Sequence, residues 1–499
     1  MKSPSVDNSR VGHPPRSWRW EYGLVLAIGA ATSPVYLGRS FFLDETVSTT
    51  LANASWHRFT QVVTQREANM ALYYLILRAW THLGNGEATV RTLSVLASLG
   101  ALFLVILLTR RLFNRRTALI CGLLFAVDPL VVELAQDARG YALSVLLVTA
   151  SSLLFVNGVR FSGGRVTWAA YVLTSALAAY VNFWAALVPL GHAASLAFLP
   201  AGSVPWRRWL SSAVALLVLL VPLGLLIRST DNAGTNWAAG TTAGHLFSAV
   251  RDHVPHLLID GVVVAVLAIV VGIVAVLRHR AGWTAVVDQW PIMFTVCWMV
   301  VPVAALVLLS FAYKPLFVLR YLYVYFPPLL MLIAMGLARL SPRTAVAGLA
   351  VLVALSGVGL WRWYSVGPGE DWRGAVTYVA DESTPGDGVM IFAPFMRIPF
   401  EWYLNQHPAI QQQLHAVYPG LAWGVDPLRF DFVVKIDQAD VARGAHGYMR
   451  VWLILSGAQP YPQEEQAVKN GLESDGLVAV STQNFTGVQI VAFAHRPGP

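Results

Sequence analysis

The sequence has few charged residues. Asp, Glu, Lys and Arg make up 12% of its 499 residues, whereas soluble globular domains carry about 25%. Hydrophobic residues make up 56%. Because a charged side chain is costly in contact with lipid, this shortage is typical of a chain whose surface largely faces a membrane. The composition therefore excludes a soluble enzyme, a disordered protein and a disulfide-rich scaffold.

Cysteine and the common cofactor motifs are also scarce. The two cysteines, Cys121 and Cys297, lie within apolar runs, so we expect no structural disulfide. The sequence contains no Walker A loop, no GxGxxG segment after a strand, no HExxH and no CxxC pair. It also lacks Asp-x-Asp, the usual metal clamp for a nucleotide-sugar donor. We assign no metal ligands and no certain cofactor, and the use of a divalent cation stays open.

Lysine occurs only four times, so arginine carries nearly all of the positive charge behind the net charge of +8. The arginines gather in short clusters between apolar runs, which is the pattern of the positive-inside rule and not that of a nucleic-acid partner. The rule places the N-terminal tail, residues 1–21, in the cytoplasm. Three long segments then lie outside: 39–90, 228–257 and everything after about residue 363. The clusters are Arg110, Arg111, Arg115 and Arg116; Arg160 and Arg165; Arg207 and Arg208; Arg278 and Arg280; and Arg339 and Arg343.

Apolar windows long enough to cross about 30 Å of hydrocarbon recur through residues 22–362. We predict an all-α polytopic membrane domain with about eleven spans, which makes the chain an integral, multi-pass cell-membrane protein with its C-terminus outside. A signal peptide ending near Ala30-Ala31-Thr32 is the alternative interpretation of the first window. The windows are 22–38, 91–109, 117–133, 141–159, 167–182, 184–200, 209–227, 258–277, 291–311, 318–337 and 344–362.

The tail, residues 363–499, has a higher charge density and shorter apolar runs. Its runs have the length of strands and alternate with helical stretches, which predicts a small extracytoplasmic α/β domain. We expect a hinge at Gly367-Pro368-Gly369. The expected strands are Val389–Ala393, Arg450–Leu455, Leu477–Ser481 and Val488–Ala494, and the expected helices are Asp371–Glu382 and Gln463–Asn470.

Two adjacent carboxylates, Asp44 and Glu45, follow the first apolar window closely. If a helix begins there, Asp44 suits the N-cap position, where it would accept a backbone N–H. In the functional interpretation, a carboxylate held at the membrane interface acts as general base on a hydroxyl, with its pKa raised by apolar surroundings. Both interpretations stay open on the residues alone.

Cations and aromatic residues alternate in the rest of this outer segment. Arg58 and Arg66 precede Tyr73, Tyr74 and Trp80. Such a stretch is either an aromatic belt with snorkelling arginines or a wall for a phosphorylated lipid head group, because guanidinium groups pair well with phosphate oxygens.

Two further groups of polar residues lie at the outer ends of apolar windows. One group runs from Asp128 to Tyr141 and includes Asp137 and Arg139. The other is formed by Lys314, Arg320, Tyr321 and Tyr323, where the two cations could hold one phosphate. Charges near a membrane interior are costly and tend to be functional, although anchoring by snorkelling explains the second group equally well.

The sequence resembles the GT-C superfamily of membrane glycosyltransferases, in the branch related to protein O-mannosyltransferases and the aminoarabinose transferase of lipid A. The resemblance covers roughly residues 20–340 and rests on the order and spacing of several short motifs. They are Phe42-Leu43-Asp44-Glu45, the run from Asn69 to Tyr74 ending at Trp80, the segment Glu87 to Ser94 with Arg91, the turn Gln136 to Leu143, Arg320-Tyr321 and, more loosely, Asp371-Trp372-Arg373.

This resemblance implies a polyprenyl-phosphate sugar as donor and an inverting transfer to a hydroxyl on the outer membrane face. Asp44 would be the base, with Glu45 as a supporting residue or metal ligand. Arg139, Tyr141 and Arg320 would contact the donor phosphate or sugar, and we add Arg58, Arg66, Asp137, Lys314 and Tyr321 as candidates for the same contacts. Met70-Ala71 stands where the family often has a proline, so the acceptor (lipid, glycan or protein) stays open.

The chemistry of the residues agrees with such a donor. One or two arginines can stabilise a lipid-phosphate leaving group without a metal ion, so the missing Asp-x-Asp fits a lipid-linked donor better than a nucleotide sugar. Two other classes stay open. A lipid or glycan transporter would show paired repeats and polar groups at the membrane midplane, and an assembly protein would work through its tail alone.

Overall fold

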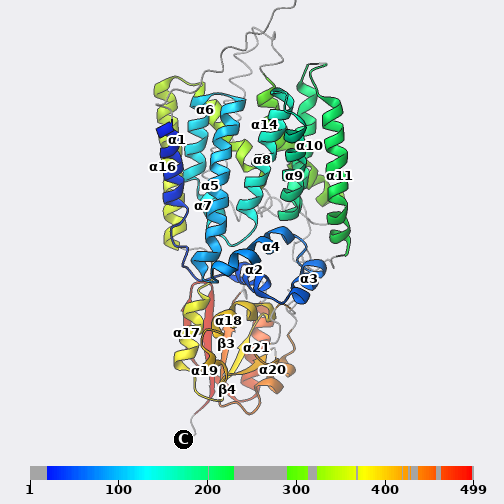
Figure 1. Ribbon diagram of the computed structural model, residues 1–499. Helices are drawn as coiled ribbons and strands as arrows, with labels where there is room; N and C mark the ends of the chain where they lie inside the picture. Colours follow the sequence, from blue (N-terminus) through cyan, green and yellow to red (C-terminus); the bar gives the residue numbers. More distant parts are fainter. Residues whose placement is uncertain are drawn as a thin grey trace, which may run out of the picture.

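The computed structural model describes residues 19–200, 202–229, 289–312, 323–366, 369–418, 420–424, 428, 436–456 and 462–496. These residues form a bundle of helices with a small sheet domain at one end (Figure 1). Three short helices, α2 (Leu43–Asn53), α3 (Trp56–Gln65) and α4 (Ala71–Trp80), lie between the bundle and the sheet domain. The segments predicted to share one side of the membrane, 39–90 and the tail, thus lie at the same end of the bundle.

Five of the described helices are long and apolar enough to cross a membrane: α5 (Glu87–Leu112), α8 (Tyr141–Arg160), α11 (Trp206–Ser229), α14 (Trp290–Ala312) and α16 (Pro342–Val366). A sixth span results if α6 (Arg115–Val127) and α7 (Pro129–Ala135) are counted together, although they meet at an angle of 61°. The chain therefore has the predicted helical membrane domain. The eleven predicted membrane spans are not reproduced within the described residues, and the predicted span 258–277 lies outside these residues.

The bend between α6 and α7 follows from the sequence Asp128-Pro129. Proline has no N–H and disfavours helical backbone at the residue before it. Asp128 is extended and its carboxylate accepts the backbone N–H groups of Leu130 (2.9 Å) and Val131 (3.3 Å), so it ends one helix and caps the next. The single span predicted over 117–133 is therefore broken.

Other predicted spans are shorter than expected. The helix α1 (Arg19–Thr32) has 14 residues, and the window 184–200 consists of η4 (Phe183–Leu187), α10 (Val188–Ser195) and η5 (Leu196–Phe198). Asn182 ends α9 (Arg165–Val181), and its side chain accepts the N–H of Trp184 to begin the next turn. The helix α15 (Phe326–Ala338) covers only the second half of the window 318–337.

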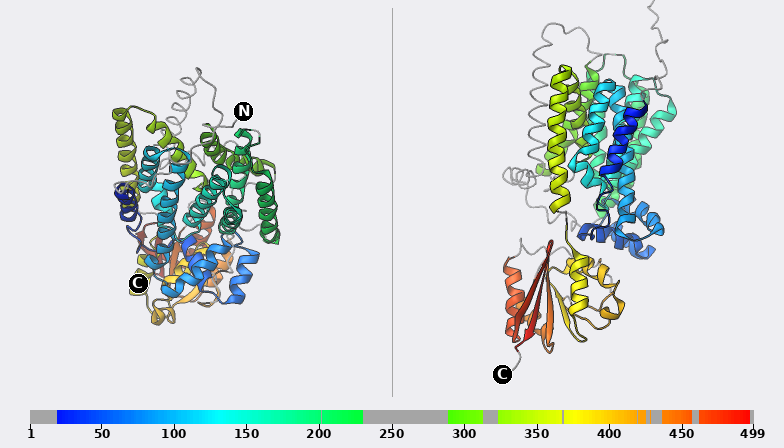
Figure 2. Two further views of the ribbon diagram at one scale, coloured as in Figure 1. Left: turned by 45° about the horizontal axis from the view of Figure 1, so that its top comes forward. Right: turned by 90° about the vertical axis from the view of Figure 1, so that its left-hand side faces the viewer.

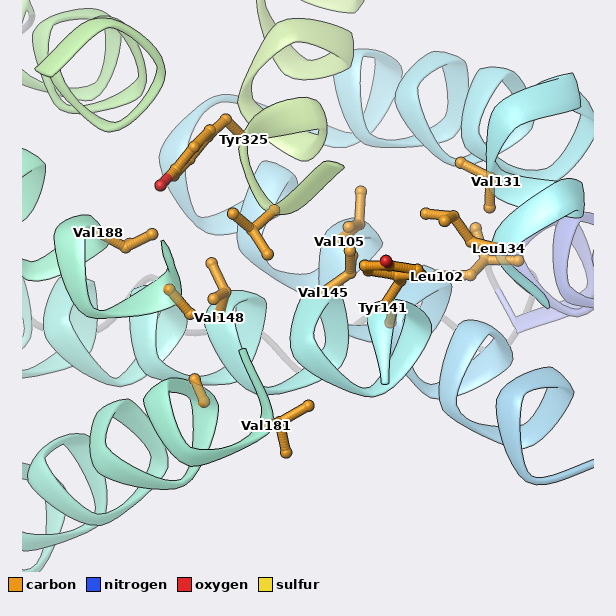
Figure 3. Close-up of a cluster of buried hydrophobic side chains, with 14 of the residues drawn as sticks. Leu102, Val105, Val131, Leu134, Tyr141, Val145, Val148, Val181, Val188 and Tyr325 are labelled. Atoms are coloured by element: carbon orange, nitrogen blue, oxygen red, sulfur yellow. The ribbon is translucent and has the colours of Figure 1, made fainter. Parts of the chain in front are cut away.

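The core of the bundle is a continuous cluster of apolar side chains, part of which is shown in Figure 3. Leu102 of α5, Val131 of α7 and Tyr141 of α8 converge there from three helices. Elsewhere small residues allow close contact: a Cβ added at Gly191 of α10 would lie 2.7 Å from the carbonyl oxygen of Cys297 on α14. Close backbone approach of this kind stabilises helix pairs in lipid.

The tail forms the predicted α/β domain. Its five strands have the order β2-β1-β3-β5-β4, with β1 parallel to β2 and β3, and β5 antiparallel to β3 and β4. The helices α17 and α21 lie on opposite sides of the sheet (Figure 2). The strands are β1 (Gly388–Ile391), β2 (His415–Tyr418), β3 (Arg450–Leu455), β4 (Leu477–Phe485) and β5 (Val488–His495); the helices are α17 (Trp372–Glu382), η10 (Pro394–Met396), α18 (Arg397–Leu404), α19 (Pro408–Gln411), α20 (Gln438–Ala445) and α21 (Pro462–Ser474).

Four strands and two helices of this domain coincide closely with the predicted segments. The strand β2 was not predicted, because only one of its four side chains is buried and the sequence His415–Tyr418 carries no long apolar run. Part of the predicted hinge, Gly367-Pro368, lies outside the described residues.

Candidate active site

The two adjacent carboxylates lie in the first turn of α2. Phe42, not Asp44, is the N-cap residue, and Asp44 occupies the second helical position. The prediction of Asp44 as N-cap is therefore wrong. Glu45 performs part of the capping instead, because its carboxylate oxygen Oε2 accepts the N–H of Phe42 at 3.3 Å. Asp44 and Glu45 consequently project from α2 in different directions and have different surroundings.

Glu45 forms a fully buried ion pair with Arg91 of α5. Its Oε1 accepts Arg91 Nε at 2.8 Å and the backbone N–H of Ala138 at 2.9 Å. Arg91 also donates to the carbonyl oxygens of Leu37 (2.7 Å) and Arg39 (2.6 Å). Since both oxygens of Glu45 already accept donors from the protein, this geometry favours a supporting role for Glu45 over metal ligation.

Asp44 faces Arg139, which lies in the turn between α7 and α8. The Asp44 Oδ2 and Arg139 Nη2 atoms are 4.0 Å apart, and their side chains are 28% and 11% exposed. This separation is longer than a hydrogen bond, but the two opposite charges still attract each other at such a distance. Asp44 thus combines a nearby cation with access from outside the protein.

The guanidinium group of Arg139 is held by three oxygens. Its Nη1 donates to the backbone carbonyl of Asp44 (3.4 Å), to Ser48 Oγ (3.3 Å) and to Tyr74 Oη (3.2 Å). Tyr74 in turn donates to Glu67 Oε2 at 3.0 Å. Burial raises the pKa of Glu67, although the charge of Arg139 opposes this change. Three segments, α2, the start of α4 and the turn before α8, therefore meet at Arg139.

Asp137 and Tyr141, which flank Arg139, both face the interior. Burial raises the pKa of Asp137 well above its usual value, and the nearby Glu45 carboxylate raises it further while Arg139 lowers it. Asp137 Oδ1 is inaccessible and accepts no hydrogen bond within the described residues. The ring of Tyr141 lies in the apolar cluster of Figure 3 and packs edge-on against Tyr323, with 5.7 Å between ring centroids.

Arg58 and Arg66 are both placed on or next to α3. Arg58 Nη1 donates to Gln61 on the same helix at 2.9 Å. Arg66 Nη1 donates to the carbonyl oxygen of Leu428 in the C-terminal domain at 3.3 Å. These hydrogen bonds connect the two arginines to α3 and to the tail, and neither is directed at Asp44.

Three predicted donor contacts, Lys314, Arg320 and Tyr321, lie outside the described residues. Tyr323 is described, and it lines a small apolar cavity of about 10 Å³, with room for about one water molecule, together with residues of α5, α6, α7, α8 and α15. Ser98 and Ala142, which also line the cavity, lie one turn from Ser94 and Arg139, and Ser94 Oγ donates to the Arg139 carbonyl oxygen at 3.4 Å. The cavity and the Asp44–Arg139 pair are therefore neighbouring features.

Sequence reasoning missed three residues of this network. Arg91 lies in one of the motifs that carry the family resemblance. Its place in the second turn of the 26-residue helix α5, ahead of a long apolar run, is a signal of a buried partner. Glu67 and Glu370 carried no recognisable spacing. Within the described residues, no three His, Cys, Asp or Glu side chains are grouped as a metal ion would require.

Comparisons with known proteins point to one class. Residues 70–229 match the family described as dolichyl-phosphate-mannose-protein mannosyltransferase, and no curated protein sequence matches the chain. The fold is similar to ArnT from Cupriavidus metallidurans in the apo state, with a TM-score of 0.57, 16% identity and coverage of 94% of this chain and 97% of that one. The same protein bound to undecaprenyl phosphate gives a TM-score of 0.56, 14% identity and coverage of 96% and 98%.

A second solved relative is the archaeal oligosaccharyltransferase AglB from Archaeoglobus fulgidus, in complex with an inhibitory peptide and a dolichol-phosphate. It gives a TM-score of 0.52, 12% identity and coverage of 95% of this chain and 74% of that one. The resemblance predicted from the sequence is thereby confirmed: the fold is that of the GT-C membrane glycosyltransferases. The predicted class of enzyme, a glycosyltransferase, is confirmed by the family match over residues 70–229.

Proposed function

We propose that the protein transfers a sugar from a polyprenyl-phosphate donor to a hydroxyl acceptor, with inversion at the anomeric carbon, on the outer face of the membrane. Asp44 is the general base, and Arg139 holds the donor phosphate. The observation that carries this proposal is the partly exposed Asp44 carboxylate facing the Arg139 guanidinium at 4.0 Å. Asp44 belongs to α2, which lies between the helical bundle and the C-terminal domain (Figure 1).

The reaction needs one base and one anion-binding group. The acceptor hydroxyl passes its proton to Asp44 while its oxygen forms a bond to the anomeric carbon. The bond between that carbon and the phosphate oxygen breaks, and the electron pair leaves on the lipid phosphate, whose charge Arg139 stabilises. General-base catalysis contributes about 10²–10⁴-fold, and alignment of the two substrates supplies on the order of 7–11 kcal/mol.

The polar network around Arg139 supports its role as a fixed anion site. The Asp44 carbonyl, Ser48 and Tyr74 hold the guanidinium in place, so less side-chain ordering is needed when a phosphate binds. The fold relatives solved with undecaprenyl phosphate and with a dolichol-phosphate show that lipid phosphates bind proteins of this fold.

The experiment is incubation of the purified protein with a panel of radiolabelled polyprenyl-phosphate sugars. We expect one donor to release free lipid phosphate, and Asp44→Asn to abolish the release while the protein stays folded. Asp381→Asn, at an exposed position of α17, is the matched control. If no lipid-linked donor reacts and the protein instead moves lipid or glycan across proteoliposomes, the proposal fails in favour of a transporter.

A further inference from the structure

The N-terminus of α2 is capped only in part by its own side chains: Glu45 accepts the N–H of Phe42, but the N–H of Leu43 has no acceptor within the helix. The first N–H groups of any helix need acceptors, and Ser, Thr, Asp or Asn at the N-cap normally provides one. Here the chain enters the helix through Phe41, Phe42 and Leu43, and Phe42 makes no side-chain cap. The helix that carries Asp44 must therefore obtain acceptors from elsewhere.

The C-terminal domain supplies an acceptor to the first helical residue, Leu43, and another to Phe41, which precedes the N-cap residue. The N–H of Phe41 donates to Tyr403 Oη of α18 at 2.7 Å, and the N–H of Leu43 donates to Glu370 Oε2 at 3.3 Å. Leu43 immediately precedes Asp44. Glu370, 327 positions beyond Leu43 in the chain, thus binds the backbone next to the proposed base.

The carboxylate of Glu370 is itself held firmly. Trp372 Nε1 donates to Oε2 at 2.6 Å, and Ser456 Oγ donates to Oε1 at 3.2 Å. Gly487, in the turn between β4 and β5, has a φ of +68°, and a Cβ there would lie 2.9 Å from Glu370 Cγ. The two hydrogen bonds from the sheet domain therefore orient the Glu370 side chain, and the absence of a Cβ at Gly487 leaves space for it.

Further contacts join the C-terminal domain to the region around the start of α2. Arg373 of α17 pairs with Glu87, the first residue of α5, and donates to the Gly38 carbonyl oxygen at 2.9 Å. Tyr403 Oη also donates to Glu87 Oε1 at 2.9 Å. The segment before α2 is thus bound to the C-terminal domain at Gly38 and Phe41, and the start of α5 at Glu87, which restricts the movement of Glu370 relative to α2.

We propose that Glu370 is a positioning residue of the transfer reaction: it supplies the missing N-terminal acceptor of α2 and so sets the position of Asp44. This inference rests on the proposed function, because the effect on catalysis presupposes that Asp44 is the base. It gives the C-terminal domain a direct part in the active site, since the domain orients the catalytic helix without contacting substrate.

The test compares Glu370→Ala, Glu370→Gln and Glu473→Ala in the full-length protein. Glutamine keeps a carbonyl oxygen for the Leu43 N–H. Its amide can donate to Ser456 Oγ once the Ser456 hydroxyl turns its single hydrogen from the side chain at position 370 to the Gly487 carbonyl oxygen, which lies 3.0 Å away. Glu473 is exposed on α21 and serves as the matched control. The two readouts are hydrogen exchange of the peptide covering residues 41–46 and the kcat and KM for the lipid-linked donor.

We expect Glu370→Ala to accelerate exchange in this peptide and to lower kcat at least about tenfold, because small displacements of a catalytic group are costly. The KM for the donor should stay within about twofold, since Arg139 is untouched. Glu370→Gln should restore both readouts, and Glu473→Ala should change neither. Unchanged exchange in Glu370→Ala, or an equal loss of kcat in Glu370→Gln, would overturn the inference. If the wild-type protein turns over no lipid-linked donor, the proposed function fails while the exchange data still decide whether Glu370 holds α2.

Discussion

Two carboxylate–arginine pairs lie side by side in this protein, and their surroundings differ. The Glu45–Arg91 pair is completely buried and saturated with hydrogen bonds. The Asp44–Arg139 pair is separated by 4.0 Å and partly exposed. One step along the same helix therefore changes a carboxylate from a structural anchor to a group that substrates can reach. We call Glu45–Arg91 the closed pair and Asp44–Arg139 the open pair. We interpret the closed pair as structural, because it holds the start of α2 in place, and the open pair as the catalytic one.

We expect the largest effect, a loss of stability, when the closed pair is broken. Glu45→Ala leaves the charge of Arg91 buried and the N–H of Ala138 without its acceptor, which should cost about 3–5 kcal/mol of folding free energy. Thermal unfolding in detergent measures it. Asp44→Ala serves as the control and should stay within about 1 kcal/mol of wild type, as surface pairs do. Equal destabilisation by the two variants would contradict the distinction between them.

The open pair should respond in activity and not in stability. Arg139→Gln removes the cation that faces Asp44, and we expect kcat for the lipid-linked donor to fall by about 10²–10³-fold, as for the loss of a donor to a developing anion. Release of lipid phosphate under single-turnover conditions measures this change. A protein with normal turnover and a lowered melting temperature would show instead that Arg139 is structural.

Asp137 lies near Glu45 of the closed pair and Arg139 of the open pair, and its protonation allows a pH-dependent test of this region. Its pKa is raised in the folded protein, mainly by burial, so the folded state prefers the protonated carboxyl. Stability should therefore fall as the pH rises from the unfolded pKa of Asp toward the folded value, by up to about 1.4 kcal/mol per pH unit. Asp137→Asn should abolish this slope. Stability measured by melting curves from about pH 4 upward should differ in slope between the two proteins, and equal slopes would contradict the account.

The smallest effect is expected at Arg58. The sequence predicted a donor contact there, whereas the structure directs its guanidinium to Gln61 on the same helix. Arg58→Gln should change the donor KM less than about twofold and stability by less than about 0.5 kcal/mol. A titration of donor concentration checks this, and a tenfold rise in KM would restore Arg58 to the phosphate site.

The sequence was sufficient for those features that depend on local patterns. Apolar windows identified the long helices, and short apolar runs identified four of the five strands. The prediction of one continuous span over 117–133 failed because the helix is broken at Asp128-Pro129, and hydropathy averaged over a window does not detect a break set by two residues. Asp44 and Arg139 could be selected because charges at the ends of apolar helices are rare. Glu370 could not, because its partner Leu43 lies 327 residues away and the contact is made through a backbone N–H.

The most direct measurement of the central claim is the rate of lipid-phosphate release by Asp44→Asn, determined beside its melting temperature. The account predicts a loss of about 10²–10⁴-fold in rate with a melting temperature close to that of the wild type, because the amide keeps the shape of the side chain and loses only its basicity. Full activity in a folded Asp44→Asn protein would contradict the claim that this carboxylate accepts the proton of the acceptor hydroxyl.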